Sequence, residues 1–96
     1  MKKSRIIDWS VYTSFQTKVF RTIMKIPKGQ VWTYGQVAQK MGDKKWAHAV
    51  GQALSKNLNA PTIPCHRVVG YNGLGGYSAP GGIRQKIKLL KNEKAL

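Results

Sequence analysis

The sequence predicts a mostly helical α+β domain with a small β-hairpin, arranged like a winged helix-turn-helix. Three observations predict it. Thr13 and Thr33 are each followed three residues later by a glutamine, which is the capping-box pattern of a helix N-terminus. Gly42 separates two short helical patterns, and Asn72-Gly73 after a β-branched pair is typical of a hairpin turn. With 96 residues there is material for one modest core, so we expect a single domain over 1–96.

The N-terminal part of the chain is predicted to form an arm followed by a helix. Residues 1–12 carry no clear period and are expected to form a short extended segment or an arm packed on the domain. A helix begins after Thr13 and ends at the Pro27-Lys28-Gly29 turn. It has an apolar face and a basic outer face, formed respectively by Phe15, Val19, Phe20 and Ile23 and by Lys18, Arg21, Thr22 and Lys25.

The central part, 34–57, predicts the helix-turn-helix. A short strand over 30–32 leads into a helix from Tyr34 to about Met41, which stops at Gly42. After a turn at 43–45, a third helix runs from about 46 to 56, and its apolar stripe is formed by Val50, Ala53 and Leu54. Such spacing also occurs in ordinary helical pairs.

The outer face of this third helix carries small or hydrogen-bonding side chains. His48, Gln52 and Ser55 are spaced i, i+4 and i+7, so they share one side of the helix. A face with little bulk can approach a nucleic-acid groove closely, although a solvated helix side would look the same. The residues assigned to this candidate DNA-binding surface are Lys44, Lys45, Ala47, His48, Gly51, Gln52 and Ser55.

The C-terminal third combines a strand, a glycine-rich loop and a helix. Val68-Val69 is predicted to form a strand. The hairpin turn after it and the flexible loop over 74–82 resemble a wing. We therefore treat 64–82 as one segment, which contains the Cys-His motif and this wing-like loop. The last helix is expected over 83–94, with Ile83, Ile87 and Leu90 buried and Arg84, Lys88 and Lys91 outside.

Charge is the strongest bulk signal, because 17 Lys and Arg face 3 Asp and Glu and the formal net charge is +14. Such an excess indicates a polyanionic partner, with nucleic acid first, although an anionic membrane or a ribosomal setting shares the signature. The sequence lacks a membrane-spanning run and a signal peptide, so we expect a soluble protein of the cytoplasm, or of the nucleoid or nucleus where the DNA is. One cysteine and two histidines are too few for a structural zinc site, and no metal is expected.

Chemistry is expected first at Cys65, the only cysteine, which is followed directly by His66. A thiol beside an imidazole is the usual arrangement of an activated sulfur nucleophile, whereas a lone cysteine can also be a small buried apolar residue. Glu93 lies in the last turn of a helix, at the margin of its apolar face, where the helix dipole disfavours an anion. It could orient a histidine that assists the thiol, or pair with a surface lysine.

The segment Pro64-Cys65-His66-Arg67-Val68-Val69 resembles the active-site signature of the O6-alkylguanine-DNA alkyltransferases. The likeness covers about 14–94, corresponding to the family's C-terminal DNA-binding and catalytic domain. The other similar segments are 29–38 entering the helix-turn-helix, 47–57 with the recognition helix and hinge asparagine, 76–78 with 81–82 in the active-site loop, and 89–93 with the C-terminal acid.

The resemblance implies direct repair of duplex DNA. The family binds the minor groove and turns the damaged guanine out of the stack. Cys65 would attack the alkyl carbon and keep it as a thioether, so that each molecule acts once and needs no cofactor. Glu93, through His66 and a water molecule, would help to remove the thiol proton. Tyr34 would help to turn the nucleotide out and would donate to the leaving guanine.

The resemblance also implies a base-binding set. Asn57 would brace the turn that holds the cysteine, and Leu54 would contact the extrahelical base. The carbonyls of Cys65 and Val68 would accept from the guanine amine, while Tyr77 and Ser78 would close over the base. A monomer in solution is expected, and cooperative binding along DNA stays open.

Three features depart from the family pattern. His48 stands where an arginine usually fills the gap left by the flipped base. The family's N-terminal domain has no counterpart in these residues, which fits either a naturally minimal form or a fragment. Ala79-Pro80 lengthens the spacing between Tyr77-Ser78 and Gly81-Gly82.

Two other functional classes stay open beside alkyl transfer. The alkyltransferase-like proteins bind alkylated DNA without transfer and flag it for other repair factors, but they typically replace the cysteine with tryptophan or another non-nucleophile. The joint presence of Cys65, His66, Tyr34 and Glu93 favours transfer. The remaining alternative is a basic winged-helix DNA-binding protein with an inert cysteine.

Overall fold

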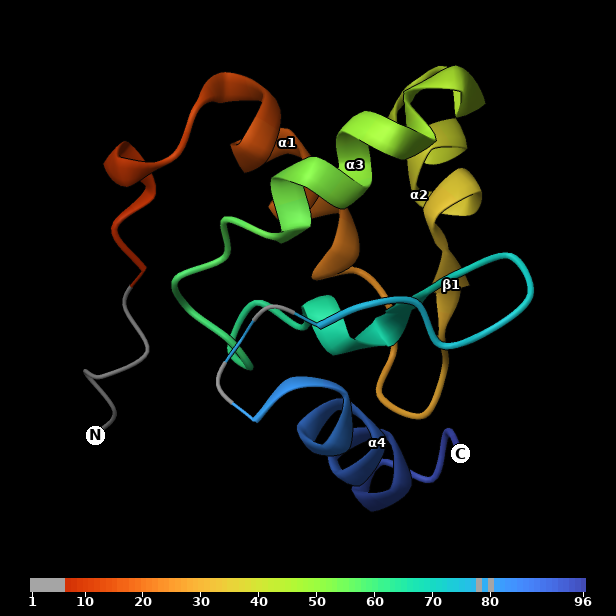
Figure 1. The fold of residues 1–96 in the computed structure, drawn as a ribbon. Coiled ribbons are helices and arrows are strands. Elements are labelled where there is room, and N and C mark those ends of the chain that lie inside the picture. The colour runs from red at the N-terminus through yellow and green to blue at the C-terminus, as the bar shows by residue number, and fades with distance from the viewer. Residues whose placement is uncertain (1–6, 78, 80) are drawn as a thin grey trace.

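The computed structural model describes residues 7–77, 79 and 81–96. Its main helices are α1 (Ser14–Ile23), α2 (Tyr34–Met41), α3 (Ala47–Leu54) and α4 (Gly82–Asn92), and its strands are β1 (Trp32–Thr33) and β2 (Val68–Val69). The described residues also form the 3₁₀ turns η2 (Trp9–Val11), η3 (Lys44–Trp46) and η4 (Cys65–Arg67). Helices α1, α2 and α3 pack on one another, and α4 lies across the segment that contains the cysteine (Figure 1).

Both predicted capping boxes are present. The Thr13 hydroxyl accepts from the Gln16 amide, and the Gln16 side chain accepts from the Thr13 amide. Thr33 and Gln36 repeat this arrangement at the start of α2, where the two bonds are 2.8 and 3.0 Å long. The orphan amides of both helix N-termini are therefore satisfied locally, which fixes where the helices begin.

The α+β class is confirmed, but the expected hairpin is reduced to one antiparallel bridge between Gly70 and Gly73. Strand β2 pairs instead with β1, in parallel, with Trp32 opposite Val68 and Thr33 opposite Val69. A parallel pair requires a long crossover. Here the crossover is the whole helix-turn-helix, so β1 and β2 join the start of α2 to the residues just after the cysteine.

Several boundaries differ from the prediction. Trp9–Val11 is a 3₁₀ turn, not extended, because the Asp8 carboxylate accepts from the Ser10 amide and caps it. The first strand is shifted to 32–33. The turn before the third helix is a 3₁₀ turn over 44–46 capped by Asp43, and α3 runs over Ala47–Leu54 instead of about 46–56. The last helix ends at Asn92, two residues early.

The buried face of α4 also differs from the prediction. Ile83 is 41 % exposed, while Lys86 is fully buried together with Leu90. Residues 86, 90 and 93 follow one side of a helix, so the face that meets the domain is rotated away from Ile83. The core joins α1, α2 and α3 to Tyr12, Ile26, Ile63 and Val68. On the predicted apolar face of α1, Val19, Phe20 and Ile23 are buried and Phe15 is partly buried.

Candidate active site

Cys65 opens η4, directly behind Pro64, and its side chain is 7 % exposed. A small pocket of about 90 Å³ leads to it. The pocket lies between the start of α2, the end of α3 and the loop before α4, and it is lined by Tyr34, Gly51, Leu54, Ser55, Cys65, Gly76 and Tyr77. The structure therefore gathers the predicted nucleophile, Tyr34, Leu54 and Tyr77 around one cavity.

His66 lies behind the cysteine and is 1 % exposed. Its Nε2 is 3.0 Å from Oε2 of Glu93, and burial lowers the pKa of the imidazole more than Glu93 raises it. The ring is therefore neutral near pH 7, and the carboxylate fixes the proton on Nε2. Nδ1 is buried and has no hydrogen-bond partner among the described residues, so it is left as an acceptor.

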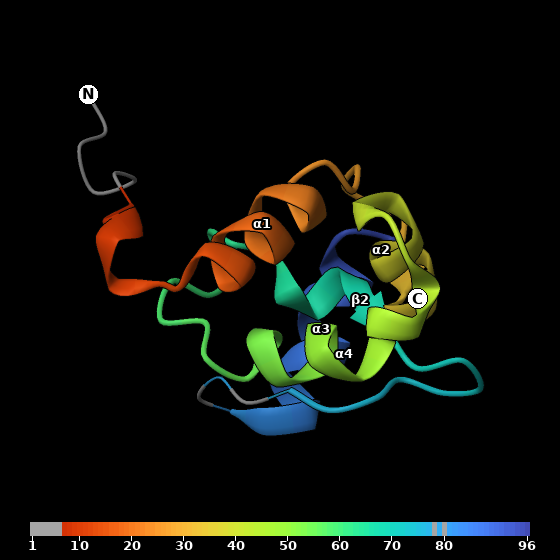
Figure 2. The ribbon, with the colours of Figure 1, turned by 90° about the horizontal axis from the view of Figure 1, so that it is seen from above.

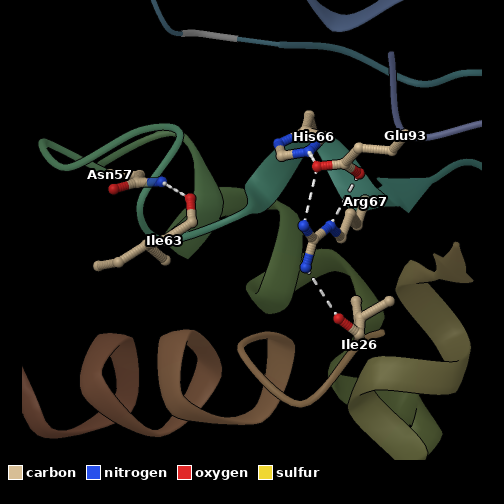
Figure 3. A network of polar contacts seen from close by, with 6 residues as sticks. All are labelled: Ile26, Asn57, Ile63, His66, Arg67 and Glu93. Atoms are coloured by element: carbon tan, nitrogen blue, oxygen red, sulfur yellow. Dashed lines mark hydrogen bonds and ion pairs between the residues drawn. The ribbon is translucent and has the colours of Figure 1, made fainter. Parts of the chain in front are cut away.

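Arg67 holds the same carboxylate from the other side (Figure 3). Its Nε donates to Oε1 of Glu93 at 2.9 Å and its Nη2 donates to Oε2 at 2.8 Å, while Nη1 donates to the Ile26 carbonyl. This fork is the main reason why the pKa of Glu93 falls from its ordinary 4.5 to about 2. Glu93 is thus tied to the two residues that follow the cysteine and not to a surface lysine.

Asn57 braces the loop that leads to the cysteine. Its Nδ2 donates to the Ile63 carbonyl at 2.9 Å, as Figure 3 shows, and its Oδ1 accepts from the Asn59 amide at 2.8 Å. Burial raises the pKa of the Cys65 thiol, and the Asn57 amide and the charge of Lys86 lower it by smaller amounts. The resting thiol keeps its proton, so a base is needed to activate it.

Tyr34 and Tyr77 face the pocket from α2 and from the loop before α4. Burial and the proximity of Cys65 raise the pKa of Tyr77 to about 12, so its hydroxyl remains a donor. Gly75 passes close to Tyr34, because a Cβ built on this glycine would lie 2.6 Å from the tyrosine hydroxyl. The backbone of the loop thus forms the wall against which Tyr34 rests.

Val68 is expected to contact the guanine through its backbone carbonyl, and this stays a prediction. Its side chain is fully buried and does not line the pocket, and its carbonyl already accepts from Lys86 Nζ at 2.8 Å. The Cys65 carbonyl accepts from the Val68 amide as part of η4. Each carbonyl therefore has one lone pair left for the guanine contact expected of it. Ser78 and Pro80, for which roles were also expected, lie outside the described residues.

The predicted DNA-contacting residues follow α3 and the turn before it. Gly51 and Ser55 reach the pocket, whereas His48 and Gln52 are exposed on the outer side of the helix, with Nε2 of each 3.4 Å apart. Lys44 and Lys45 are exposed in η3, and Ala47 begins the helix. In Figure 2, α3 lies between α1, on which it packs, and the loop over 70–77, whose Gly76 and Tyr77 line the pocket together with Gly51 of α3 and its C-cap Ser55.

Sequence reasoning missed two residues of this region, Arg67 and Lys86. Arg67 follows the Cys-His pair directly, but nothing local indicates that its partner lies 26 residues away. Lys86 precedes the buried Leu90 by four residues, and this spacing on the apolar stripe is the signal that could have found it.

Two negative findings concern the described residues. In 7–77, 79 and 81–96, no three His, Cys, Asp or Glu side chains lie close enough together to hold a metal ion. None of the helices of this part of the chain is long and apolar enough to cross a membrane.

Relatives are found by sequence and by structure. A methylated-DNA–protein-cysteine methyltransferase of Saccharolobus islandicus (strain L.S.2.15) is 49 % identical over 79 residues, which are 82 % of this chain and 50 % of that protein. The crystal structure of Mycobacterium tuberculosis OGT in complex with DNA is 42 % identical, with a TM-score of 0.80, over 86 % of this chain and 50 % of that one. The structure of S. pombe Atl1 in complex with damaged DNA containing O6-carboxymethylguanine is 32 % identical, with a TM-score of 0.67, over 82 % of this chain and 74 % of that one.

The family assignment rests on most of the chain. The 96 residues span about half the length of the curated relatives that they match. The family model described as "6-O-methylguanine DNA methyltransferase, DNA binding domain" matches residues 14–95. Together with the likeness to the solved structures, this match shows that the chain belongs to the 6-O-methylguanine DNA methyltransferase family.

Proposed function

We propose that this protein repairs O6-alkylguanine in duplex DNA by taking the alkyl group onto Cys65 in a single irreversible transfer. The observation that carries the proposal is the order of groups from the pocket inward. Cys65 lines the pocket, His66 lies behind it with no partner for Nδ1 in the part of the chain that the structure describes, and Glu93 holds the other ring nitrogen. A buried thiol backed by an oriented neutral base is suited to nucleophilic attack.

The transfer can be written with these groups. A water molecule passes the Cys65 proton to Nδ1 of His66, and the resulting imidazolium is stabilised by Glu93. The thiolate attacks the alkyl carbon opposite O6, a C–S bond forms, the C–O bond breaks, and its electron pair stays on the guanine. The Tyr34 hydroxyl, which lines the same pocket, donates to the leaving guanine and stabilises its charge.

Duplex DNA is the partner that charge and surface support best. The net charge is +14, and α3 exposes His48 and Gln52 on its outer side while Gly51 and Ser55 reach the pocket beside Gly76 and Tyr77. Phosphate contacts from lysines supply affinity, and a face of low bulk permits close approach to a groove. Turning the base out of the stack brings the O6 substituent within reach of a thiol that lies inside a pocket.

Mass spectrometry of the protein after reaction with a duplex that carries one O6-methylguanine tests the proposal. We expect the Cys65 peptide to gain one methylene equivalent while guanine is restored in the DNA. Cys65→Ala should bind the duplex but gain no mass, and an undamaged duplex should leave the wild type unchanged. Damage-selective binding with no mass change would assign the chain to the sensor class, the alternative raised by its likeness to Atl1.

A further inference from the structure

Lys86 is the one lysine that the structure buries completely among those in the described residues. Its Nζ donates to the Val68 carbonyl at 2.8 Å, to the Gly76 carbonyl at 3.0 Å and to the Leu74 carbonyl. An ammonium group has three N–H donors, and all three are used. Within the described part of the chain no carboxylate pairs with it, because Glu93 on the same helix is held by His66 and Arg67.

A buried cation costs free energy that an apolar side chain of the same length would not. Burial lowers the pKa of Lys86 to about 8, which reflects that cost. Lys86 and Leu90 are the two buried residues of α4, so position 86 is one where methionine or leucine would pack. The lysine must therefore supply something that packing does not.

Its three bonds converge on the two ends of one loop. Val68 lies in β2, just before the loop, and Leu74 and Gly76 lie at its far end. The neck between these ends is narrow, because Gly70 bridges to Gly73 and a Cβ on Gly75 would lie 3.1 Å from the Gly70 amide nitrogen. Gly76 and the next residue, Tyr77, line the pocket above Cys65.

We propose that Lys86 is a positioning residue, whose ammonium group fastens the loop over 70–76 to β2 and so holds Gly76 and Tyr77 over the cysteine. The part of this inference that concerns reaction rate rests on the proposed alkyl transfer, whereas the tether itself does not. Without the ammonium, the three carbonyls lose their common donor and the pocket wall is free to move outward.

The test compares Lys86→Met with Lys88→Met. Methionine fills a similar volume but donates no hydrogen bond, and Lys88 is an exposed lysine on the same helix, so it controls for the lost charge. Hydrogen exchange of the amides over 70–77 should be roughly tenfold faster in K86M than in K88M, as expected for loss of about one hydrogen bond. Unchanged protection of this loop in a folded K86M would overturn the proposal.

The same two variants separate positioning from binding. With O6-methylguanine duplex, the maximal transfer rate of K86M should fall by roughly tenfold to a hundredfold, because a displaced wall misplaces the base. Its affinity for undamaged duplex should match that of K88M. An equal loss of transfer rate in K86M and K88M would show that Lys86 contributes only its positive charge and does not position the loop, which would overturn the proposal. If the wild type transfers no alkyl group, the proposed function fails, yet the exchange experiment still decides on the tether.

A measurement without a Lys86 substitution covers the case in which K86M does not fold. The titratable groups near the ammonium are Cys65 and His66, and the other contacts are carbonyls. In Cys65→Ala, raising the pH from 7 to 9 deprotonates Lys86 while His66 stays neutral, because the pKa of Lys86 is about 8 in the wild type and loss of Cys65 removes an influence that raises it. Loop protection, corrected for intrinsic exchange, should fall over this range, and constant protection would contradict the tether.

Discussion

Oε2 of Glu93 lies 3.0 Å from Nε2 of His66 and 2.8 Å from Nη2 of Arg67, so one carboxylate is shared by the two residues that follow the cysteine. This shared carboxylate fixes the tautomer of His66 and also has a structural role. Because Glu93 is the C-cap of α4, it also fastens that helix to η4, the 3₁₀ turn that begins at Cys65. The group that would orient the base therefore also holds the last helix in place.

Replacing Glu93 by Gln should lower the free energy of unfolding at pH 7 by about 2 kcal/mol, because the half-buried Arg67 loses its counter-ion and the buried, neutral His66 loses a charged hydrogen-bond acceptor. The wild type should also lose stability as the pH falls from 4.5 to about 2. The pKa of Glu93 is lower in the folded state than in the unfolded state. Its stabilising effect is therefore fully present above the unfolded-state pKa of 4.5 and is lost as the carboxylate is protonated near pH 2. Urea denaturation between pH 2 and 7 measures both effects.

Asp8→Asn is the matched control for this variant. The Asp8 carboxylate also has a lowered pKa, caused by Ser10, but it lies on the exposed arm. We expect this variant to keep most of the acid dependence of the wild type. If E93Q showed the same acid dependence as the wild type, the ion pair with Arg67 would not stabilise the fold.

The helices and their starts follow from local chemistry, which is why the sequence predicts them. Thr13 and Thr33 each find their partner three residues away, and Gly42, with a φ of +133°, ends α2 where an L side chain would be strained. The interactions that build the site are distant in sequence. Arg67 and Glu93 are 26 residues apart, and β1 reaches β2 only after the helix-turn-helix.

The error at α4 has the same origin. Apolar spacing favours Ile83 for the buried face, because a sequence pattern treats lysine as a solvated residue. The carbonyls of Val68, Leu74 and Gly76 make burial of Lys86 tolerable, and they converge only in the folded chain. The hairpin is present only as the bridge between Gly70 and Gly73, since Asn72-Gly73 indicates a turn but not which strand Val68 will join.

Replacing Asn57 by Ala should slow transfer and reduce stability by about 1–2 kcal/mol, because the part-buried Ile63 carbonyl loses its donor. The loop that positions Cys65 would lose its brace at both Ile63 and Asn59. Single-turnover rates and urea midpoints measure the two effects. Asn92→Ala, at the exposed end of α4, should leave both unchanged, and equal behaviour of the two variants would show that the brace is dispensable.

Replacing Gly75 by Ala should displace Tyr34 or the loop that it touches. The new methyl group would lie 2.6 Å from the Tyr34 hydroxyl, and the φ of +73° is unfavourable for an L side chain. We expect a loss of about 1–3 kcal/mol in stability and slower transfer. Gly73→Ala is the control, since nothing lies within 4 Å of its Cβ position. A G75A protein as active as G73A would show that the close approach to Tyr34 has no functional part.

Replacing His48 by Arg should accelerate transfer from duplex substrate but not from a free O6-methylguanine base. His48 is exposed on the outer side of α3, and among the described residues its side chain has Gln52 as its one hydrogen-bond partner. A longer, permanently charged guanidinium can stack in the gap that a flipped base leaves and can contact phosphate. Gln52→Arg adds the same charge one turn away and controls for general DNA affinity. Equal acceleration in both variants would assign the gain to charge, whereas a gain confined to H48R and to duplex would assign it to base flipping.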